Sequence, residues 1–372
     1  MRICFIGNLE SIHLQRFAKS FADRGHDVHV ISDKPVPIPG VRVHPILLMP
    51  GLEPNPLRRS FELLIRAWQV RRIVREIQPD VVHSHFVLAY GIYGALSGRR
   101  PHVISTWGSD VRLTRRWSVR HALSKIAYIG SDAVYTGDSF SRELLIGLGC
   151  GPSKIIIQPW GVDNTRFSPV ARSESIRKRL LGDSNGIILT MVSAIDPAYD
   201  IESLLRALPL VKSEVPVKLV LIGDGKQREA IGKLAVELGI ADKIDFLGKI
   251  PHDEIHEYYA SSDIYVDTCH PEGAGAGIGV AVMEAMSSGL PIICANRLGI
   301  EAAVKDGLSG LLFKGGAPSE LAEKISALIA DPLRRAAMGK ASRETALKIG
   351  NWDREMGEFE NSYKRLLQNR SR

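Results

Sequence analysis

The sequence has no long hydrophobic run: no stretch in its 372 residues approaches the roughly 20 apolar residues that a membrane-spanning helix requires. Its first residues, MRICFIGN, read as a strand and lack the long apolar region and cleavage site of a signal peptide. We therefore expect a cytoplasmic protein.

Cysteine is scarce, and no spacing typical of a metal site is present. The four cysteines lie far apart and form neither a CxxC pair nor a zinc motif, so we expect four buried thiols. The eleven histidines include no HExxH, and no Asp-x-Asp pair stands ready to hold a divalent ion against a diphosphate. We predict no bound metal.

The net positive charge of the chain comes from its first half. Residues 1–160 carry 21 Lys and Arg against 12 Asp and Glu, whereas residues 161–372 carry 27 against 29. The excess lies in residues 58–78 and 112–125, where arginines interleave with apolar residues at helical spacing. Such helices either lie peripherally on the anionic inner face of a membrane or present a basic face to solvent. No nucleic-acid-binding motif accompanies the charge, so we expect no nucleic-acid partner.

Most of the chain alternates short apolar strands with amphipathic helices, which predicts an α/β fold of parallel, doubly wound sheets. The alternation stops at PWGVDNTRFSP, residues 159–169, and then resumes, so we place a domain boundary there. At about 100 to 200 residues per domain the length fits two domains, residues 1–165 and 166–350. Residues 351–372 carry an apolar helical stripe that we expect to pack back across to the first domain.

The individual elements follow from the same patterns. The expected strands are residues 2–6, 28–31, 41–46, 81–83, 102–105 and 133–136 before the boundary, and 187–192, 217–222, 243–246, 264–266 and 292–294 after it. The expected helices include residues 12–23, 61–77 and 142–148. The first strand-to-helix turn reads IGNLESIH and lacks GxGxxG, which disfavours a nicotinamide-dependent dehydrogenase.

A glycine-rich loop is the most informative motif. Between residues 273 and 279 glycine stands at every second position, and an apolar helix carrying Glu284 follows. A loop without side chains lets a ligand touch backbone, and the first N–H groups of the next helix suit a phosphate. The order strand, glycine loop, helix, strand is the unit in which such loops bind nucleotides. We expect a phosphorylated ligand here; a tight turn between packed elements is the alternative.

Seven segments lie in order along nearly the whole chain: IGNLESIHLQRFAKSFADRGHDVHVIS, PDVVHSHF, STWGSDV, QPWGVDNTRFSP, VLIGDGKQRE, DFLGKIPHDEIHEYYASSDIYVD and GVAVMEAMSSGLPIICANRLGIEAAVKDGLSGLLF. Together they resemble the family-4-type retaining glycosyltransferases of GT-B fold. The resemblance implies two facing Rossmann-like domains with a cleft between them. It also implies an acceptor in the first domain and a nucleotide-sugar donor, a UDP- or GDP-sugar, on the second, with no cofactor.

The resemblance assigns donor-binding roles in the second domain. Glu284 matches the second glutamate of a paired-glutamate motif, which accepts hydrogen bonds from the ribose hydroxyls; a glutamate favoured by the helix dipole is the alternative. Backbone N–H groups would meet the diphosphate, and two further loops would border the base. The residues that correspond to these roles are Gly279, Val280 and Ala281 for the diphosphate, and Gly223, Gly225, Lys249 and Ile250 for the base.

In the first domain the resemblance assigns His85 to a histidine that faces the transferred sugar, and Gly108 and Asp110 to the loop after the fifth strand. His13 would lie where the first loop meets donor and acceptor. Trp107 replaces a common histidine, and its flat ring could stack on a sugar. The alternatives are satisfied loop histidines, a helix-capping Asp110 and a tryptophan that only packs.

Three donor contacts of the family are missing or moved. The family holds the diphosphate with an Arg and a Lys in a segment like VGRLxxxKG, but here the segment reads VSAIDPAYD, with Ala194 and Tyr199 at those positions. Ala276 stands where the first glutamate of the pair is expected, and Glu272, four residues earlier, is the candidate replacement. Hydrogen bonds to charged groups are worth about 1.5 to 3 kcal/mol each, so these losses matter. The basic residues that could substitute are Lys226, Lys249 and Arg297.

The sequence therefore favours a metal-independent, hexosyltransferase-type glycosyltransferase that moves a sugar from a nucleotide diphosphate to a glycan or lipid-linked acceptor. Retention of configuration is implied by the resemblance alone. A rival hypothesis is a pseudoenzyme that lost its diphosphate clamp and serves as a partner subunit of an active glycosyltransferase. A sugar-nucleotide epimerase is a weaker hypothesis, because such enzymes resemble this chain in fold but not in the GVAVMEAM segment.

Overall fold

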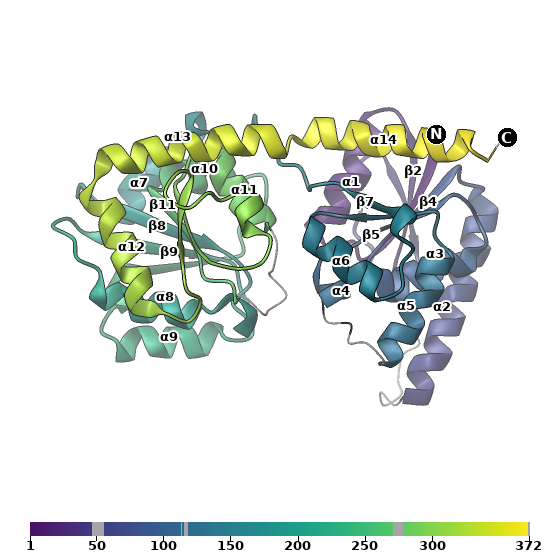
Figure 1. Ribbon diagram of the computed structural model, residues 1–372, viewed down its shortest axis with the longest axis horizontal. Coiled ribbons are helices and arrows are strands. Elements are labelled where there is room, and N and C mark those ends of the chain that lie inside the picture. The colour runs from purple at the N-terminus through teal and green to yellow at the C-terminus, as the bar shows by residue number, and fades with distance from the viewer. Residues whose placement is uncertain (47–55, 113, 115–117, 271–277, 371–372) are drawn as a thin grey trace. The chain divides into compact units, whose positions relative to one another are not determined.

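The chain folds into two compact units. The computed structural model describes residues 1–46, 56–112, 114, 118–270 and 278–370, and Figure 1 shows its helices and strands. The first unit comprises Met1–Pro159 and Arg354–Arg372, and the second comprises Trp160–Asp353. The chain thus leaves the first unit where the sequence pattern pauses, and returns to it in the C-terminal helix.

The first unit is built on a parallel sheet of seven strands in the order β3-β2-β1-β4-β5-β6-β7. Its strands are β1 (Arg2–Ile6), β2 (Asp27–Ser32), β3 (Val41–Pro45), β4 (Val81–His85), β5 (His102–Ser105), β6 (Ala133–Thr136) and β7 (Ile155–Ile157). Its helices are α1 (Ile12–Asp23), α2 (Pro56–Ile77), α3 (Ile92–Ser97), α4 (Ser109–Arg112), α5 (Val119–Ile129), α6 (Ser139–Gly147) and most of α14 (Trp352–Gln368).

Helices cover both faces of this sheet because alternate strand residues point to opposite sides. Val82 of β4 joins Cys4 in the buried cluster beneath α2 and α3. The neighbouring residue His83 faces the other side, where its ring lies 6.1 Å from that of Phe17 in α1 and 5.9 Å from that of Phe359 in α14. β4 therefore contributes to two cores at once.

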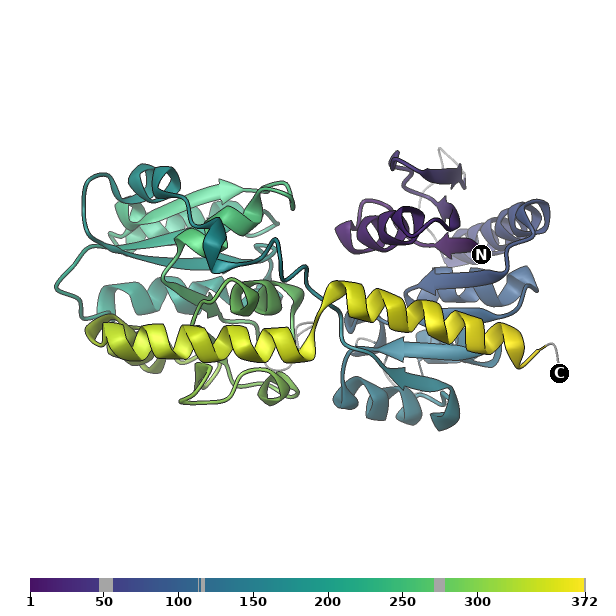
Figure 2. The same ribbon diagram turned by 90° about the horizontal axis from the view of Figure 1, so that it is seen from above.

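The C-terminal helix α14 is anchored to the first unit by buried polar contacts as well as by its apolar stripe. The Tyr363 hydroxyl lies 2.5 Å from Nδ1 of His83, and the Tyr135 hydroxyl donates to Oγ of Ser362 at 2.6 Å. Phe359 is fully buried among these residues. Figure 2 shows α14 lying over the strands of this unit.

The second unit has a parallel sheet of six strands in the order β10-β9-β8-β11-β12-β13. Its strands are β8 (Ile187–Val192), β9 (Val217–Ile222), β10 (Ile244–Gly248), β11 (Ile264–Asp267), β12 (Ile292–Ala295) and β13 (Gly310–Phe313). Its helices are α7 (Glu174–Leu181), α8 (Ile201–Ala207), α9 (Arg228–Glu237), α10 (Ile255–Ser261), α11 (Val280–Ser287), α12 (Pro318–Ala330) and α13 (Pro332–Ile349), with a short 3-10 helix η4 (Pro197–Tyr199).

Local sequence explains where several of these helices begin. Asp138 accepts a hydrogen bond from the backbone N–H of Ser141 at the start of α6, and Ser118, Ser173 and Asp331 cap α5, α7 and α13 in the same way. Such caps satisfy N–H groups that a helix leaves unpaired and are worth about 1 kcal/mol each.

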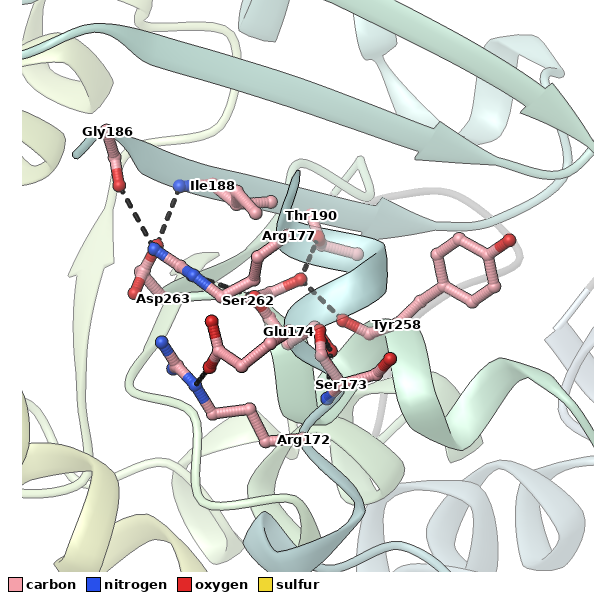
Figure 3. A network of polar contacts seen from close by, with 11 residues as sticks. Arg172, Ser173, Glu174, Arg177, Gly186, Ile188, Thr190, Tyr258, Ser262 and Asp263 are labelled. Carbon is pink, nitrogen blue, oxygen red and sulfur yellow. Dashed lines mark hydrogen bonds and ion pairs between the residues drawn. The ribbon is translucent and has the colours of Figure 1, made fainter. Parts of the chain in front are cut away.

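A polar network at the amino-terminal edge of the second sheet fixes α7 to the strands (Figure 3). Arg177 binds Asp263 at 2.9 Å, and the same carboxylate accepts from the backbone N–H of Ile188, the second residue of β8, at 2.8 Å. Arg177 also donates to the carbonyl oxygens of Gly186 and Ser261. These contacts lie at the edge opposite to the strands' carboxyl ends, so we infer that they stabilise the fold and do not bind a ligand.

The predicted fold class is confirmed: both sheets are parallel and carry helices on both faces. The prediction omitted β7 and β13, which are edge strands of three and four residues. Short edge strands carry too few residues for a periodicity to show. The four cysteines are free and buried, as expected. No helix in the described part of the chain is long and apolar enough to cross a bilayer.

Candidate functional site

Each sheet has one point where the strand order reverses. In the first unit it lies between β1 and β4, and in the second between β8 and β11. In open parallel sheets, loops at the carboxyl ends of the two diverging strands leave a crevice in which ligands bind. These two places are therefore the candidate sites.

Two glycines bring the loops after β8 and β9 into backbone contact. A Cβ on Gly223, whose φ is +132°, would lie 1.9 Å from the carbonyl oxygen of Ser193, and one on Gly225 would lie 2.5 Å from that of Ile195. Two backbone hydrogen bonds, from Ile195 to Asp224 and from Gln227 to Ile195, join the loops. Both predicted glycines thus shape this edge, and only glycine fits.

The segment that replaces the family's basic clamp is built into the same edge. The carbonyl oxygen of Tyr199 accepts from the Thr268 hydroxyl at 2.7 Å, and the backbone N–H of His270 donates to Ala198 at 2.9 Å. Burial raises the pKa of the half-buried Tyr199 hydroxyl. Ala194 is half-buried. Neither residue offers a cation to a diphosphate.

The three basic residues that could replace the missing diphosphate contacts differ in their surroundings. Lys226 and Lys249 are exposed on the loops after β9 and β10, and Ile250 beside Lys249 is half-buried. Arg297, after β12, has a side chain only 1% exposed and binds the Asp267 carboxylate at 2.7 Å. Asp267 also accepts from the backbone N–H of Cys269 at 2.9 Å. Arg297 therefore ties the ends of β11 and β12 together.

Helix α11 follows β11 and starts at the carboxyl edge of the sheet. Gly279 is its extended N-cap residue, with Val280 and Ala281 in the first turn. The N–H groups of a first helical turn have no partner within the helix, which suits an anion. Glu272 and Ala276 lie outside the described residues.

Glu284 lies one turn further along α11 and is 4% exposed. Its Oε1 accepts from Nε2 of His252 at 2.8 Å, and its Oε2 accepts from the hydroxyl of Tyr259 at 3.2 Å. The carboxylate is thus held by two side chains from α10 and the loop before it. Sequence reasoning missed His252, because no spacing rule links it to a residue 32 positions away.

In the first unit, His85 and Trp107 form a stack with His13. The Trp107 ring lies 4.6 Å from that of His13 and 5.6 Å from that of His85, with interplanar angles of 22° and 25°. The indole Nε1–H donates to Nδ1 of His85 at 3.3 Å. The structure thus brings together three of the predicted residues, which lie at the end of β4, in the first turn of α1 and in the loop after β5.

His85 is neutral, and its tautomer follows from its partner. Burial lowers the pKa of His85 to about 3. Because an indole N–H can only donate, Nδ1 of His85 must be the acceptor and its proton must lie on Nε2. Nε2 is buried and has no hydrogen-bond partner among the described residues. His85 therefore offers a donor and is a poor base at neutral pH.

Asp110 holds two loops of the first unit together. Its Oδ1 accepts from the backbone N–H of Trp107 and its Oδ2 from that of Val87, both at 3.0 Å. Burial raises the pKa of this carboxyl to about 6. Gly108, between Trp107 and Asp110, has a φ of +94°. Phe86, before Val87, is a non-glycine residue at a φ of +79°. Strained backbone of this kind clusters at functional sites.

Within the described ranges, no group of three or more His, Cys, Asp or Glu side chains could hold a metal ion.

Comparison with protein families matches both units. Residues 2–137 match the family described as glycosyl transferase 4-like, and residues 172–345 match the glycosyl transferases group 1. The GDP-mannose-dependent alpha-(1-6)-phosphatidylinositol monomannoside mannosyltransferase of Mycolicibacterium smegmatis is 30% identical over 295 residues, which cover 77% of this chain and 76% of the relative. The D-inositol 3-phosphate glycosyltransferase of Acidothermus cellulolyticus is 27% identical and covers 92% and 82%.

Solved structures share the fold across the whole chain. Sucrose-phosphate synthase from Thermosynechococcus elongatus aligns with a TM-score of 0.84 at 19% identity, covering 99% of this chain and all of that one. Anabaena HepE, solved in complex with UDP, aligns with a TM-score of 0.80 at 20% identity, covering 98% and 100%. The chain therefore belongs to the group 1 glycosyl transferases and has the two-domain GT-B fold of family-4-type glycosyltransferases.

Proposed function

We propose that this protein transfers a hexose from a nucleotide diphosphate sugar to a glycan or lipid-linked acceptor, without a metal and with retention of configuration. The family match across both units carries the proposal. It is supported by relatives whose names specify a GDP-mannose donor and a phosphatidylinositol monomannoside acceptor. The second unit is the donor lobe and the first is the acceptor lobe.

In the second unit, the donor lies against the carboxyl edge of the sheet. Backbone N–H groups at Gly279, Val280 and Ala281 receive the diphosphate, and the loops at Gly223 to Gly225 border the base. Charge on the diphosphate grows as the bond from the sugar carbon to the phosphate oxygen breaks, because the electron pair leaves with the phosphate. Fixed N–H dipoles stabilise that charge, and the exposed Lys226 and Lys249 add positive charge nearby.

In the first unit, His85 acts as a neutral hydrogen-bond donor toward a sugar hydroxyl. Its pKa of about 3 and its engaged Nδ1 exclude a role as general base near neutral pH. The acceptor hydroxyl forms the new bond on the face that the diphosphate leaves, and its proton passes to the departing phosphate. In the first unit His13 and Trp107 lie beside His85, and Asp110 holds the loops in place.

Nucleotide release tests the proposal directly. Wild-type protein is incubated with UDP-, GDP- and ADP-sugars, with and without glycan and phosphoinositide acceptors, and free nucleotide is measured. Acceptor-dependent release that falls at least tenfold in Glu284→Ala is expected. Glu237→Ala, which removes an exposed glutamate from α9, should release nucleotide at the wild-type rate. Equal rates in all three proteins would place the donor elsewhere.

The replaced clamp favours a second candidate, a subunit without activity that partners an active glycosyltransferase. Tyr199 and Ala194 supply no cation, and Arg297 is bound to Asp267. This candidate predicts no heat of binding for any of the donors by calorimetry. It also predicts a stable complex with a second glycosyltransferase chain. Nucleotide release by the purified protein would exclude it.

Helix α2 supports peripheral contact with an anionic membrane. Phe61, Leu64 and Trp68 lie at helical spacing and are 58%, 62% and 62% exposed, and the exposed Arg71 and Arg75 continue along the helix. Aromatic and basic side chains side by side suit a lipid interface. Co-sedimentation with vesicles containing anionic lipid should weaken with salt and with Trp68→Ser. Binding that does not change with salt concentration or with the charge of the lipid would contradict this contact.

A further inference from the structure

The carboxylate of Glu284 is covered on both sides by protein. Its side chain is 5% exposed, whereas that of His252, which donates to Oε1, is 18% exposed. Tyr259, which donates to Oε2, is fully buried. A ligand arriving from solvent therefore meets the imidazole of His252 before it meets the carboxylate.

The chemistry of the pair fixes which nitrogen faces the ligand. A carboxylate only accepts hydrogen bonds, so Nε2 of His252 carries a proton and donates it to Glu284 in either protonation state of the ring. Nδ1, on the other side of the ring, is left for a further partner. A carboxylate that holds a histidine in one tautomer is a common way to prepare that histidine for a ligand.

The surroundings hold the ring in this orientation. The buried Phe167 ring lies 5.4 Å from the ring of His252 and 5.8 Å from that of Tyr259. Backbone N–H groups of Glu254 and Ile255 both donate to the carbonyl of Pro251, which fixes the turn carrying His252 at the start of α10. This turn follows β10 at the carboxyl edge of the sheet, where nucleotides bind in such folds.

We propose that His252 is the side chain that contacts the ribose of the donor, and that Glu284 is a positioning residue acting through it; this rests on the proposed nucleotide-sugar binding. A ribose hydroxyl both donates and accepts, so it can pair with Nδ1 whether that atom carries a proton or not. In the family that this chain resembles, a glutamate contacts the ribose. Here that contact belongs to His252, which lies between Glu284 and solvent.

Calorimetric binding of UDP and GDP, and of their 2′-deoxy and 3′-deoxy forms, tests this assignment. His252→Gln keeps a donor toward Glu284 but removes Nδ1, and His252→Ala removes both. Each variant should bind the ribonucleotide at least about tenfold more weakly, the equivalent of one lost hydrogen bond. Each should also lose the discrimination against at least one deoxy form. His256→Ala, which removes a neighbouring histidine of α10 that also packs on Phe167, is the matched control and should bind normally.

A double mutant separates positioning from direct contact. If Glu284 acts through His252, the variant carrying Glu284→Gln and His252→Ala binds no more weakly than His252→Ala alone. Wild-type affinity and deoxy discrimination in His252→Gln would overturn the assignment and return the ribose contact to Glu284. Wild-type protein that binds none of these nucleotides would instead overturn the proposed function, and this assignment with it.

Discussion

The buried pair of Arg297 and Asp267 provides the sharpest test of what the loop after β12 does. By sequence position Arg297 could replace a lost diphosphate contact, yet its side chain is 1% exposed and lies 2.7 Å from a carboxylate that is 10% exposed. If the contact is structural, removing the guanidinium leaves Asp267 charged, buried and without its counter-ion. We therefore expect Arg297→Met to destabilise the second unit.

The size of the effect follows from the burial of the pair. Breaking a buried ion pair by removing one partner costs about 3 to 5 kcal/mol, because a charge stays behind without compensation. Asp267 keeps one hydrogen bond, from the backbone N–H of Cys269 at 2.9 Å, so the lower end of this range applies. Adding Asp267→Asn to Arg297→Met removes the orphaned charge and should recover most of the loss. Arg297→Lys keeps the charge without the planar fork and should fall between.

Urea unfolding of the full-length protein, followed by circular dichroism, gives the free energy of unfolding for the four proteins. Hydrogen exchange of peptides covering β11 and β12 assigns the change to the second unit, because two units need not unfold together. Calorimetry with UDP and GDP is run on the same samples. Wild-type stability in Arg297→Met, together with lost nucleotide affinity, would refute the structural role and make Arg297 a donor ligand.

Three further predictions use the same unfolding assay. Gly225→Ala should destabilise the protein by about 1 to 3 kcal/mol, because its Cβ would lie 2.5 Å from a backbone oxygen. Gly232→Ala, inside α9 with its nearest neighbour 3.6 Å away, should instead stabilise by about 0.5 to 1 kcal/mol, and equal effects would refute the steric argument. Tyr363→Phe should cost about 1 to 3 kcal/mol by leaving the buried Nδ1 of His83 without its partner; an unchanged midpoint would show that the contact contributes nothing. Burial raises the pKa of Asp110 to about 6 in the folded protein, so the carboxyl ionises first in the unfolded chain. The free energy of unfolding of the wild type should therefore fall as the pH rises from about 4 to about 6. Relative to wild type, the free energy of unfolding of Asp110→Asn should therefore rise by up to about 3 kcal/mol over that pH range. A difference between the two proteins that does not change with pH would contradict the raised pKa of Asp110.

The candidate site was only partly predictable, and particular residues show why. Gly223 and Gly225 follow directly from a motif, and the structure adds that backbone contact demands them. Glu284 was found by position, but its partners were not. His252 is separated from it by 32 residues, and only the packing of α10 against α11 brings the two together. A pattern within one element cannot reveal a contact between two.

The sequence by itself determined the architecture. Alternating strands and helices require parallel sheets with both faces covered, and most strand positions follow from runs of apolar residues. Tertiary structure alone decided the states of the polar side chains. Arg297 became an ion-pair partner, His85 became a neutral donor and Glu284 became covered, because burial and the nearest partner set charge and accessibility. Both depend on atoms that folding brings together from distant parts of the chain.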